Sequence, residues 1–190
     1  MLAPLLPASL VLAAGAFAYL ASAPPVVQDP PMERPSPHHE RVLRGAGHWK
    51  GKLTMFMPGM PPQTVDAEEI AEPIGKFWLR TQFHCSFMGM AMEGSALFGY
   101  SATDKKFVGT WTDSMSSYLA MMEGEYDEER DLIIMRWKAP YMGTELVPHH
   151  YELAQKDDSY TSTFFVEQDG KTVKNMVIEM QRSADGDGDK

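Results

Sequence analysis

The stretch from Lys76 to Phe87, KFWLRTQFHCSF, alternates between two kinds of side chain with a period of two. One face of an extended chain would be apolar, and it would hold Phe77, Leu79, Thr81, Phe83, Cys85 and Phe87. The other face would be mostly polar, and it would hold Lys76, Trp78, Arg80, Gln82, His84 and Ser86. This alternation is typical of an antiparallel strand with one buried face.

The same periodicity continues on both sides of this strand. We predict nine further strands, at residues 47–57, 63–73, 89–100, 105–113, 117–126, 131–139, 145–155, 159–167 and 171–183. Turn residues such as Pro58-Gly59 and Asp169-Gly170 separate several of them. No helical segment is long enough for a parallel crossover. A meander of about ten strands removes its exposed edges by closing, so we favour an all-β, antiparallel up-and-down barrel over an open sandwich.

A short helix should precede the first strand. Ser36 suits the N-cap, Pro37 suits the first helical position, and Glu40 lies in the first turn. We expect the helix to end near Gly45 or Gly47, and we expect His38 and His39 to be exposed.

The chain outside the barrel divides into three segments. Residues 1–23 contain the apolar run ASLVLAAGAFAYLASA, which predicts either a cleaved export signal or a membrane anchor. Residues 24–37 hold six prolines and predict an extended linker, and residues 184–190 form an acidic tail. The barrel domain would span residues 38–183. We therefore expect an exported protein of the periplasm or cell envelope, with a membrane tether as one alternative.

The composition excludes several classes of protein. The net charge of -9 argues against a nucleic-acid partner, because phosphate contacts require clustered Lys and Arg. The single cysteine, Cys85, excludes an internal disulfide framework. An acidic block from Glu123 to Asp131 and the acidic tail carry most of the net charge. This distribution indicates local charge on the surface and not an electrostatic field that attracts a charged substrate.

The stretch from Gly99 to Met115, GYSATDKKFVGTWTDSM, resembles the signature of a bacterial family of uncharacterised proteins, the domain-of-unknown-function family 1579. Further elements resemble the family at His39 to Trp49, at Glu93-Gly94, at Gly124 to Asp127 and at Met176 to Arg182. Ser101 and Met180 depart from the usual aspartate and tyrosine. The resemblance implies a lipocalin-like (calycin) barrel and no established activity.

A second resemblance implies a structural role for Trp49 and Arg182. Gly47-His48-Trp49 is similar to the Gly-x-Trp start of lipocalins, in which a basic residue of the last strand covers the tryptophan. We expect Arg182 to stack on Trp49 and to close that end of the barrel.

Methionine is unusually frequent, with 15 residues. Met88, Met90 and Met92 would share one strand face, and flexible thioether side chains suit an oily pocket. We predict that a small lipophilic molecule binds in the barrel. The residues expected to line the site are Met88, Met90, Met92, Phe98, Trp111, Asp113, Met135, His149, Tyr151 and Met176. Soft sulfur ligands leave Cu(I) as an alternative, and an inward histidine leaves haem.

No catalytic motif is recognisable, so we predict no catalytic residue, no metal site and no required cofactor. His84 and Cys85 are neighbours in a strand, and their side chains therefore point to opposite faces and cannot form a dyad. The same argument allows only one of His149 and His150 to face the interior. Two other functions stay open: an enzyme acting through Asp113, His149 or His150, and a structural module of the cell envelope.

Overall fold

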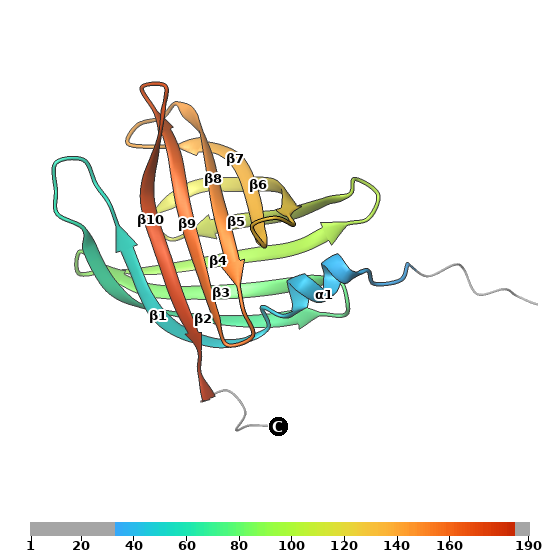
Figure 1. Ribbon diagram of the computed structural model, residues 1–190. Coiled ribbons are helices and arrows are strands. Elements are labelled where there is room, and N and C mark those ends of the chain that lie inside the picture. Colours follow the sequence, from blue (N-terminus) through green and yellow to red (C-terminus); the bar gives the residue numbers. More distant parts are fainter. Residues whose placement is uncertain (1–32, 185–190) are drawn as a thin grey trace, which may run out of the picture. The chain divides into compact units, whose positions relative to one another are not determined.

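The computed structural model describes residues 33–184, which form one helix and ten strands (Figure 1). The helix α1 spans Pro37–Leu43. The strands are β1 Gly47–Met55, β2 Gln63–Ile74, β3 Trp78–Phe87, β4 Met90–Ser101, β5 Lys106–Asp113, β6 Ser116–Asp127, β7 Leu132–Pro140, β8 Leu146–Gln155, β9 Ser159–Gln168 and β10 Lys171–Arg182. The ten predicted strands are confirmed, with ends that differ by a few residues.

Every strand pairs antiparallel with the next one in the chain, and β1 pairs with β10 to close the barrel. In the closing ladder Trp49 lies opposite Arg182, and Met55 lies opposite Met176. The up-and-down barrel predicted from the meander is therefore correct. Closure satisfies the backbone groups that β1 and β10 would otherwise leave unpaired at two edges.

The helix α1 packs against β3 and β4 and begins as predicted, with Ser36 at its N-cap and Pro37 at its first position. The expectation that His39 is exposed is wrong, because only 1% of its surface is accessible. Its Nδ1 accepts a hydrogen bond from the Ser36 backbone N–H at 2.9 Å, and its Nε2 lies 3.0 Å from the Tyr100 carbonyl oxygen. The imidazole thus joins α1 to β4.

The two ends of the barrel differ. At one end β1 begins, α1 is attached, and Val42, Trp49 and Phe107 are each 1% exposed. We call this the closed end. At the opposite end β1 finishes. This end also holds the connections β1–β2, β3–β4, β5–β6, β7–β8 and β9–β10. We call this end the mouth.

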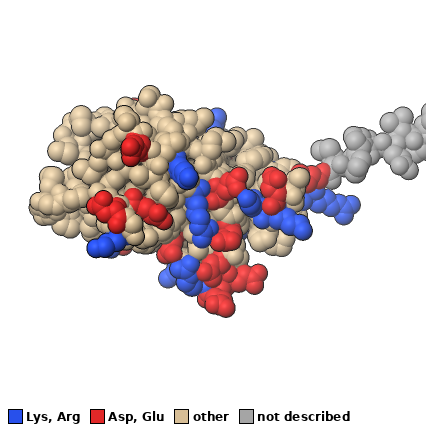
Figure 2. Space-filling model, turned by 90° about the horizontal axis from the view of Figure 1, so that it is seen from above, with Lys and Arg blue, Asp and Glu red and all other residues tan. Residues whose placement is uncertain are grey.

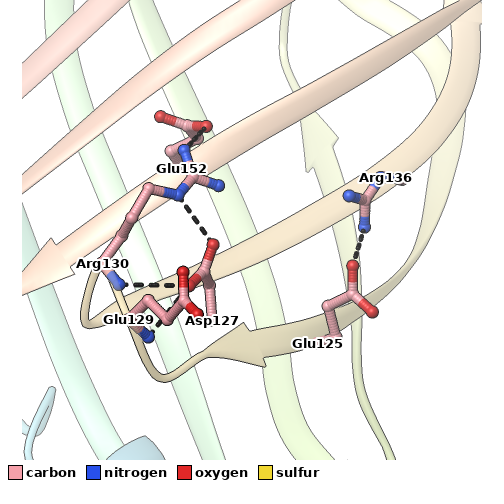
Figure 3. Close-up of polar contacts among 6 residues, drawn as sticks. All are labelled: Glu125, Asp127, Glu129, Arg130, Arg136 and Glu152. Atoms are coloured by element: carbon pink, nitrogen blue, oxygen red, sulfur yellow. Dashed lines mark hydrogen bonds and ion pairs between the residues drawn. The ribbon is translucent and has the colours of Figure 1, made fainter.

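The acidic block lies at the β6–β7 hairpin of the closed end, and several of its carboxylates form ion pairs on the outer surface. Arg130 bridges Asp127 and Glu152 at 2.7 and 2.9 Å, and Arg136 bonds Glu125 at 3.0 Å (Figure 3). These exposed pairs contribute little to stability individually. Their position agrees with a charge that belongs to the surface.

Residues 1–32 and 185–190 lie outside the described residues, so the predicted signal or anchor at 1–23, most of the linker 24–37 and the acidic tail stay predictions. Across residues 33–184, no helix is both long and apolar enough to cross a membrane.

Candidate functional site

The barrel encloses a cavity of about 320 Å³. Its lining comes from both ends, because it includes Val42 of α1 at the closed end and Met176 of β10 near the mouth. The wall is mainly apolar, and Phe83, Phe98, Trp111, Trp137 and Phe164 supply its aromatic part. A volume of this size suits a small organic molecule.

The strongest polar feature in the cavity is Glu69. Strand alternation directs Glu69 inward together with Ala67 and Ala71, which are almost completely buried. Burial raises the pKa of the Glu69 carboxyl to about 7, and a hydrogen bond with the Tyr160 side chain opposes this rise. Near neutral pH the carboxyl is therefore divided between its neutral and charged forms.

Two tyrosines accompany Glu69. Burial and the nearby Glu69 carboxylate raise the pKa of both Tyr160 and Tyr151 above the ordinary value. Tyr160 also packs edge-on against Trp49, with 5.1 Å between the ring centroids. Both phenols thus remain neutral hydrogen-bonding groups in an apolar wall.

Asn175 contributes a polar atom of a different kind. It lies where a register shift between Lys174 and Met176 interrupts the β9–β10 ladder, and it lines the cavity near the mouth. Its Oδ1 is buried and has no hydrogen-bond partner among the described residues. Since an unpaired buried acceptor is costly, this atom is suited to accept a hydrogen bond from a molecule in the cavity.

Asp113 is held in place by two neighbours. Its Oδ2 accepts a hydrogen bond from Trp111 Nε1 at 2.8 Å, and its Oδ1 accepts one from the Met115 backbone N–H at 2.9 Å. The Trp111 ring in turn covers Gly94, where an added Cβ would lie 2.2 Å from the ring. Asp113 therefore forms the β5–β6 turn and orients the indole, while it also lines the cavity.

His149 faces the interior and His150 faces outward. The His149 ring is stacked on Trp137 at 5.2 Å between centroids, and its Nε2 lies 3.3 Å from the Ala139 carbonyl oxygen. Burial lowers the pKa of His149, so the ring is neutral near pH 7. His150 is stacked on Phe165, with 4.6 Å between the ring centroids.

Seven of the ten predicted lining residues line the cavity: Met92, Phe98, Trp111, Asp113, His149, Tyr151 and Met176. The other three do not, and the prediction is corrected for them. Met88 and Met90 are 66% and 50% exposed because β3 and β4 end beside them at the mouth. Met135 points inward but is fully buried, since its sulfur packs over Gly124.

Arg182 lies where the sequence places it. Its guanidinium carbon is 4.2 Å from the centroid of the Trp49 ring. The same group donates hydrogen bonds to the carbonyl oxygens of Ala46, Arg44 and Asp157, at 2.6, 3.1 and 2.9 Å. Arg182 thus joins the last strand, the first strand and the segment after α1 at the closed end.

The thiol of Cys85 faces inward and lies 3.8 Å from Met92 Sδ. Burial raises its pKa, which disfavours the nucleophilic thiolate. Within the described part of the chain, no three His, Cys, Asp or Glu side chains come together as a metal site.

A family model described as "Protein of unknown function (DUF1579)" matches residues 34–182. The chain belongs to this family. The match covers the whole barrel, and it confirms the resemblance drawn from residues 99–115. No curated protein matches the sequence.

Two solved structures share the architecture of this family member. Rv2717c from M. tuberculosis aligns with a TM-score of 0.57 and 11% identity, over 79% of this chain and 99% of the other. The S-type phycobiliprotein lyase CPES from Guillardia theta aligns with a TM-score of 0.50 and 12% identity, over 80% and 93% of the two chains. At such identities the likeness shows a lipocalin-like fold alone.

Sequence reasoning missed Glu69, Tyr160 and Asn175. For Glu69 a signal existed, because the period of two in residues 63–73 places it on the same face as Val65, Ala67 and Ala71. Tyr160 follows from the same rule on β9. Asn175 could not be found this way, since the register shift beside it breaks the alternation.

Proposed function

We propose that this barrel binds a small, uncharged lipophilic molecule in its interior and does not catalyse a reaction. The main support for this proposal is the cavity of about 320 Å³, whose wall is mostly apolar with a few polar atoms. That combination is typical of binding sites for small apolar ligands, in which polar groups fix the orientation.

The polar atoms narrow the class of ligand. The unpaired Asn175 Oδ1 requires a hydrogen-bond donor, and Glu69 with Tyr160 can accept or donate a hydrogen bond at the closed end. A carboxylate ligand is disfavoured, because ionised Glu69 would repel it inside a low-dielectric cavity. A neutral molecule that carries an N–H or O–H group fits these constraints best.

Fluorescence titration with N-phenyl-1-naphthylamine, a neutral lipophilic probe with one N–H group, tests the proposal. Ala96→Phe places a ring in the cavity and should weaken binding at least about tenfold. Ala91→Phe makes the same change at an exposed position of the same strand and should leave binding unchanged. Equal affinity of both variants would mean that the probe binds outside the cavity.

We also propose that the protein acts outside the cytoplasm, because the apolar run before Pro24 is typical of an export signal or an anchor. Cell fractionation of the full chain, with mass determination of the recovered protein, tests this and distinguishes cleavage near residue 23 from retention as an anchor. Recovery in the cytoplasmic fraction at full length would contradict it.

A further inference from the structure

The exposed large apolar side chains are concentrated at the mouth. Among the described residues, four of the five mouth connections carry an exposed methionine or adjoin one. We call the side chains of Met60, Met88, Met90, Met115 and Met142 the methionine rim; their exposed fractions lie between 48% and 77%. At the closed end, the connections contain or adjoin one such residue, Ile74.

Charged side chains show the opposite distribution. The five mouth connections hold two charged residues, Glu145 and Asp169, and two more, Asp113 and Lys171, adjoin them. The four β-hairpin connections of the closed end hold ten: Lys76, Asp104, Lys105, Glu128, Glu129, Arg130, Asp131, Lys156, Asp157 and Asp158. In Figure 2 most charges on the visible face lie in its right half, and the left half, on the side of the β1–β2 and β3–β4 connections, is mostly uncharged.

Two rim methionines occupy a backbone conformation that methionine disfavours. Met88 and Met142 have φ angles of 52° and 50°, in the left-handed region. Across residues 33–184, the other non-glycine residues with positive φ are Lys105, Asp131 and Asp169, which are polar. A bulky apolar residue in this conformation costs about 1 kcal/mol or more, so these turns present methionine against the local preference.

We propose that the methionine rim docks on the surface of a lipid bilayer, so that the mouth faces the membrane. Docking there buries flexible apolar side chains and few charges, whereas burying the closed end would strip water from ten charged groups. Methionine suits a fluid, irregular surface because its side chain adapts its shape. The proposal does not require that the cavity be occupied.

The length of the chain before the barrel is compatible with this orientation. Thirteen residues separate Ala23 from Pro37, and an extended chain of that length spans at most about 45 Å. Strands of this barrel have 8 to 12 residues, so their own length is at most about 40 Å. A segment anchored before residue 24 would therefore allow the mouth to reach the same bilayer.

The test uses the full chain and a probe at each end of the barrel. Met88→Cys, Met142→Cys and, as the matched control, Ile74→Cys are labelled with an environment-sensitive nitrobenzoxadiazole group. The unsubstituted protein, in which Cys85 faces the interior, gives the labelling blank. Phosphatidylcholine vesicles with a nitroxide on the acyl chain then quench any label that enters the bilayer. Because the readout is local, it is independent of any anchoring by residues 1–23.

We expect labels at positions 88 and 142 to be quenched at least about threefold more strongly than the label at position 74. Met142→Glu in the Met88→Cys protein should reduce quenching of the label at 88, and Ile74→Glu should not. Equal quenching at the two ends, or none at the mouth, would overturn the proposal. So would a concentration-dependent shift of the position-88 emission without lipid, since that would assign the rim to a second copy of the chain. If the protein failed to bind N-phenyl-1-naphthylamine but its mouth labels were quenched, only the proposed ligand function would be refuted.

Discussion

Glu69 belongs to an acid-rich stretch of β2 in which most carboxylates are exposed, yet its own side chain faces the cavity. Asp66, Glu68 and Glu72 point outward, so composition alone gives no sign of a buried acid. Only the alternation along β2 distinguishes Glu69 from its neighbours. The inward direction of the Glu69 side chain could therefore be predicted from the sequence, but the size of its pKa shift depends on the surrounding barrel.

The raised pKa of Glu69 predicts a pH-dependent stability. Between the unfolded value of 4.5 and the folded value of about 7, the folded state binds more protons than the unfolded state. The free energy of unfolding should therefore fall as pH rises through this window, by about 1–3 kcal/mol from this group. Urea unfolding of the wild type at intervals from about pH 4.5 to 8 measures it.

Two variants separate the contribution of Glu69 from that of His149. The lowered pKa of His149 makes the free energy of unfolding rise with pH, which is opposite to the effect of Glu69. Glu69→Gln should be more stable than the wild type near pH 8 and should lose this part of the pH dependence. Glu68→Gln, an exposed neighbour, should retain it. A Glu69→Gln curve parallel to the wild-type curve would show that Glu69 does not titrate in this window.

Arg182 also acts at the scale of a single residue. The Gly-x-Trp start of the first strand predicts its contact with Trp49, whereas no local pattern reveals its hydrogen bonds to backbone carbonyl oxygens. Arg182→Ala removes the cation–π contact with Trp49 and the hydrogen bonds to three carbonyl oxygens. We expect it to lower the free energy of unfolding by about 2–3 kcal/mol. Arg182→Lys should recover part of this loss, because an ammonium group cannot reproduce the guanidinium geometry.

Arg136→Ala is the matched control, since it removes an exposed ion pair with Glu125. It should change stability by less than about 1 kcal/mol. If Arg182→Ala behaved in the same way in chemical denaturation, the closure of this end would not depend on Arg182.

At the scale of elements, the ten strands and the helix follow from the sequence because each strand has one buried face and ends at recognisable turn residues. The hairpin from β3 to β4 shows the limit of this reasoning. A continuous period of two predicts that Met88, Met90 and Met92 share a cavity face, but Met88 and Gly89 form the connection. The alternation in the sequence continues past the point at which the wall of the barrel ends.

The pairing of β4 with β5 gives a prediction about the cavity wall. Gly94→Ala would place a methyl group 2.2 Å from the Trp111 ring, so the indole must move. We expect a loss of stability of about 1–3 kcal/mol and a changed near-ultraviolet circular dichroism spectrum. In Gly143→Ala the added Cβ has no close neighbour. This variant should change the stability by no more than about 0.5 kcal/mol and should leave the near-ultraviolet spectrum unchanged. Unchanged tryptophan signals in Gly94→Ala would contradict the contact.

At the scale of the whole molecule, the sequence predicts closure of the barrel but not its interior volume. The same period of two is compatible with a solid core and with a cavity, because both need apolar inward side chains. The difference arises from how individual side chains pack: Met135 fills the space over Gly124, whereas Met92 and Met176 leave space beside them. Such packing depends on contacts between strands that are distant in the chain.

A crystal structure of the protein in complex with N-phenyl-1-naphthylamine would show directly whether the barrel binds a lipophilic molecule in its interior. We expect the naphthyl group inside the barrel between Trp111, Trp137 and Met176, with the amine N–H donating to Asn175 Oδ1. An interior filled by its own side chains, or a probe bound only on the outer surface with water in the cavity, would contradict it.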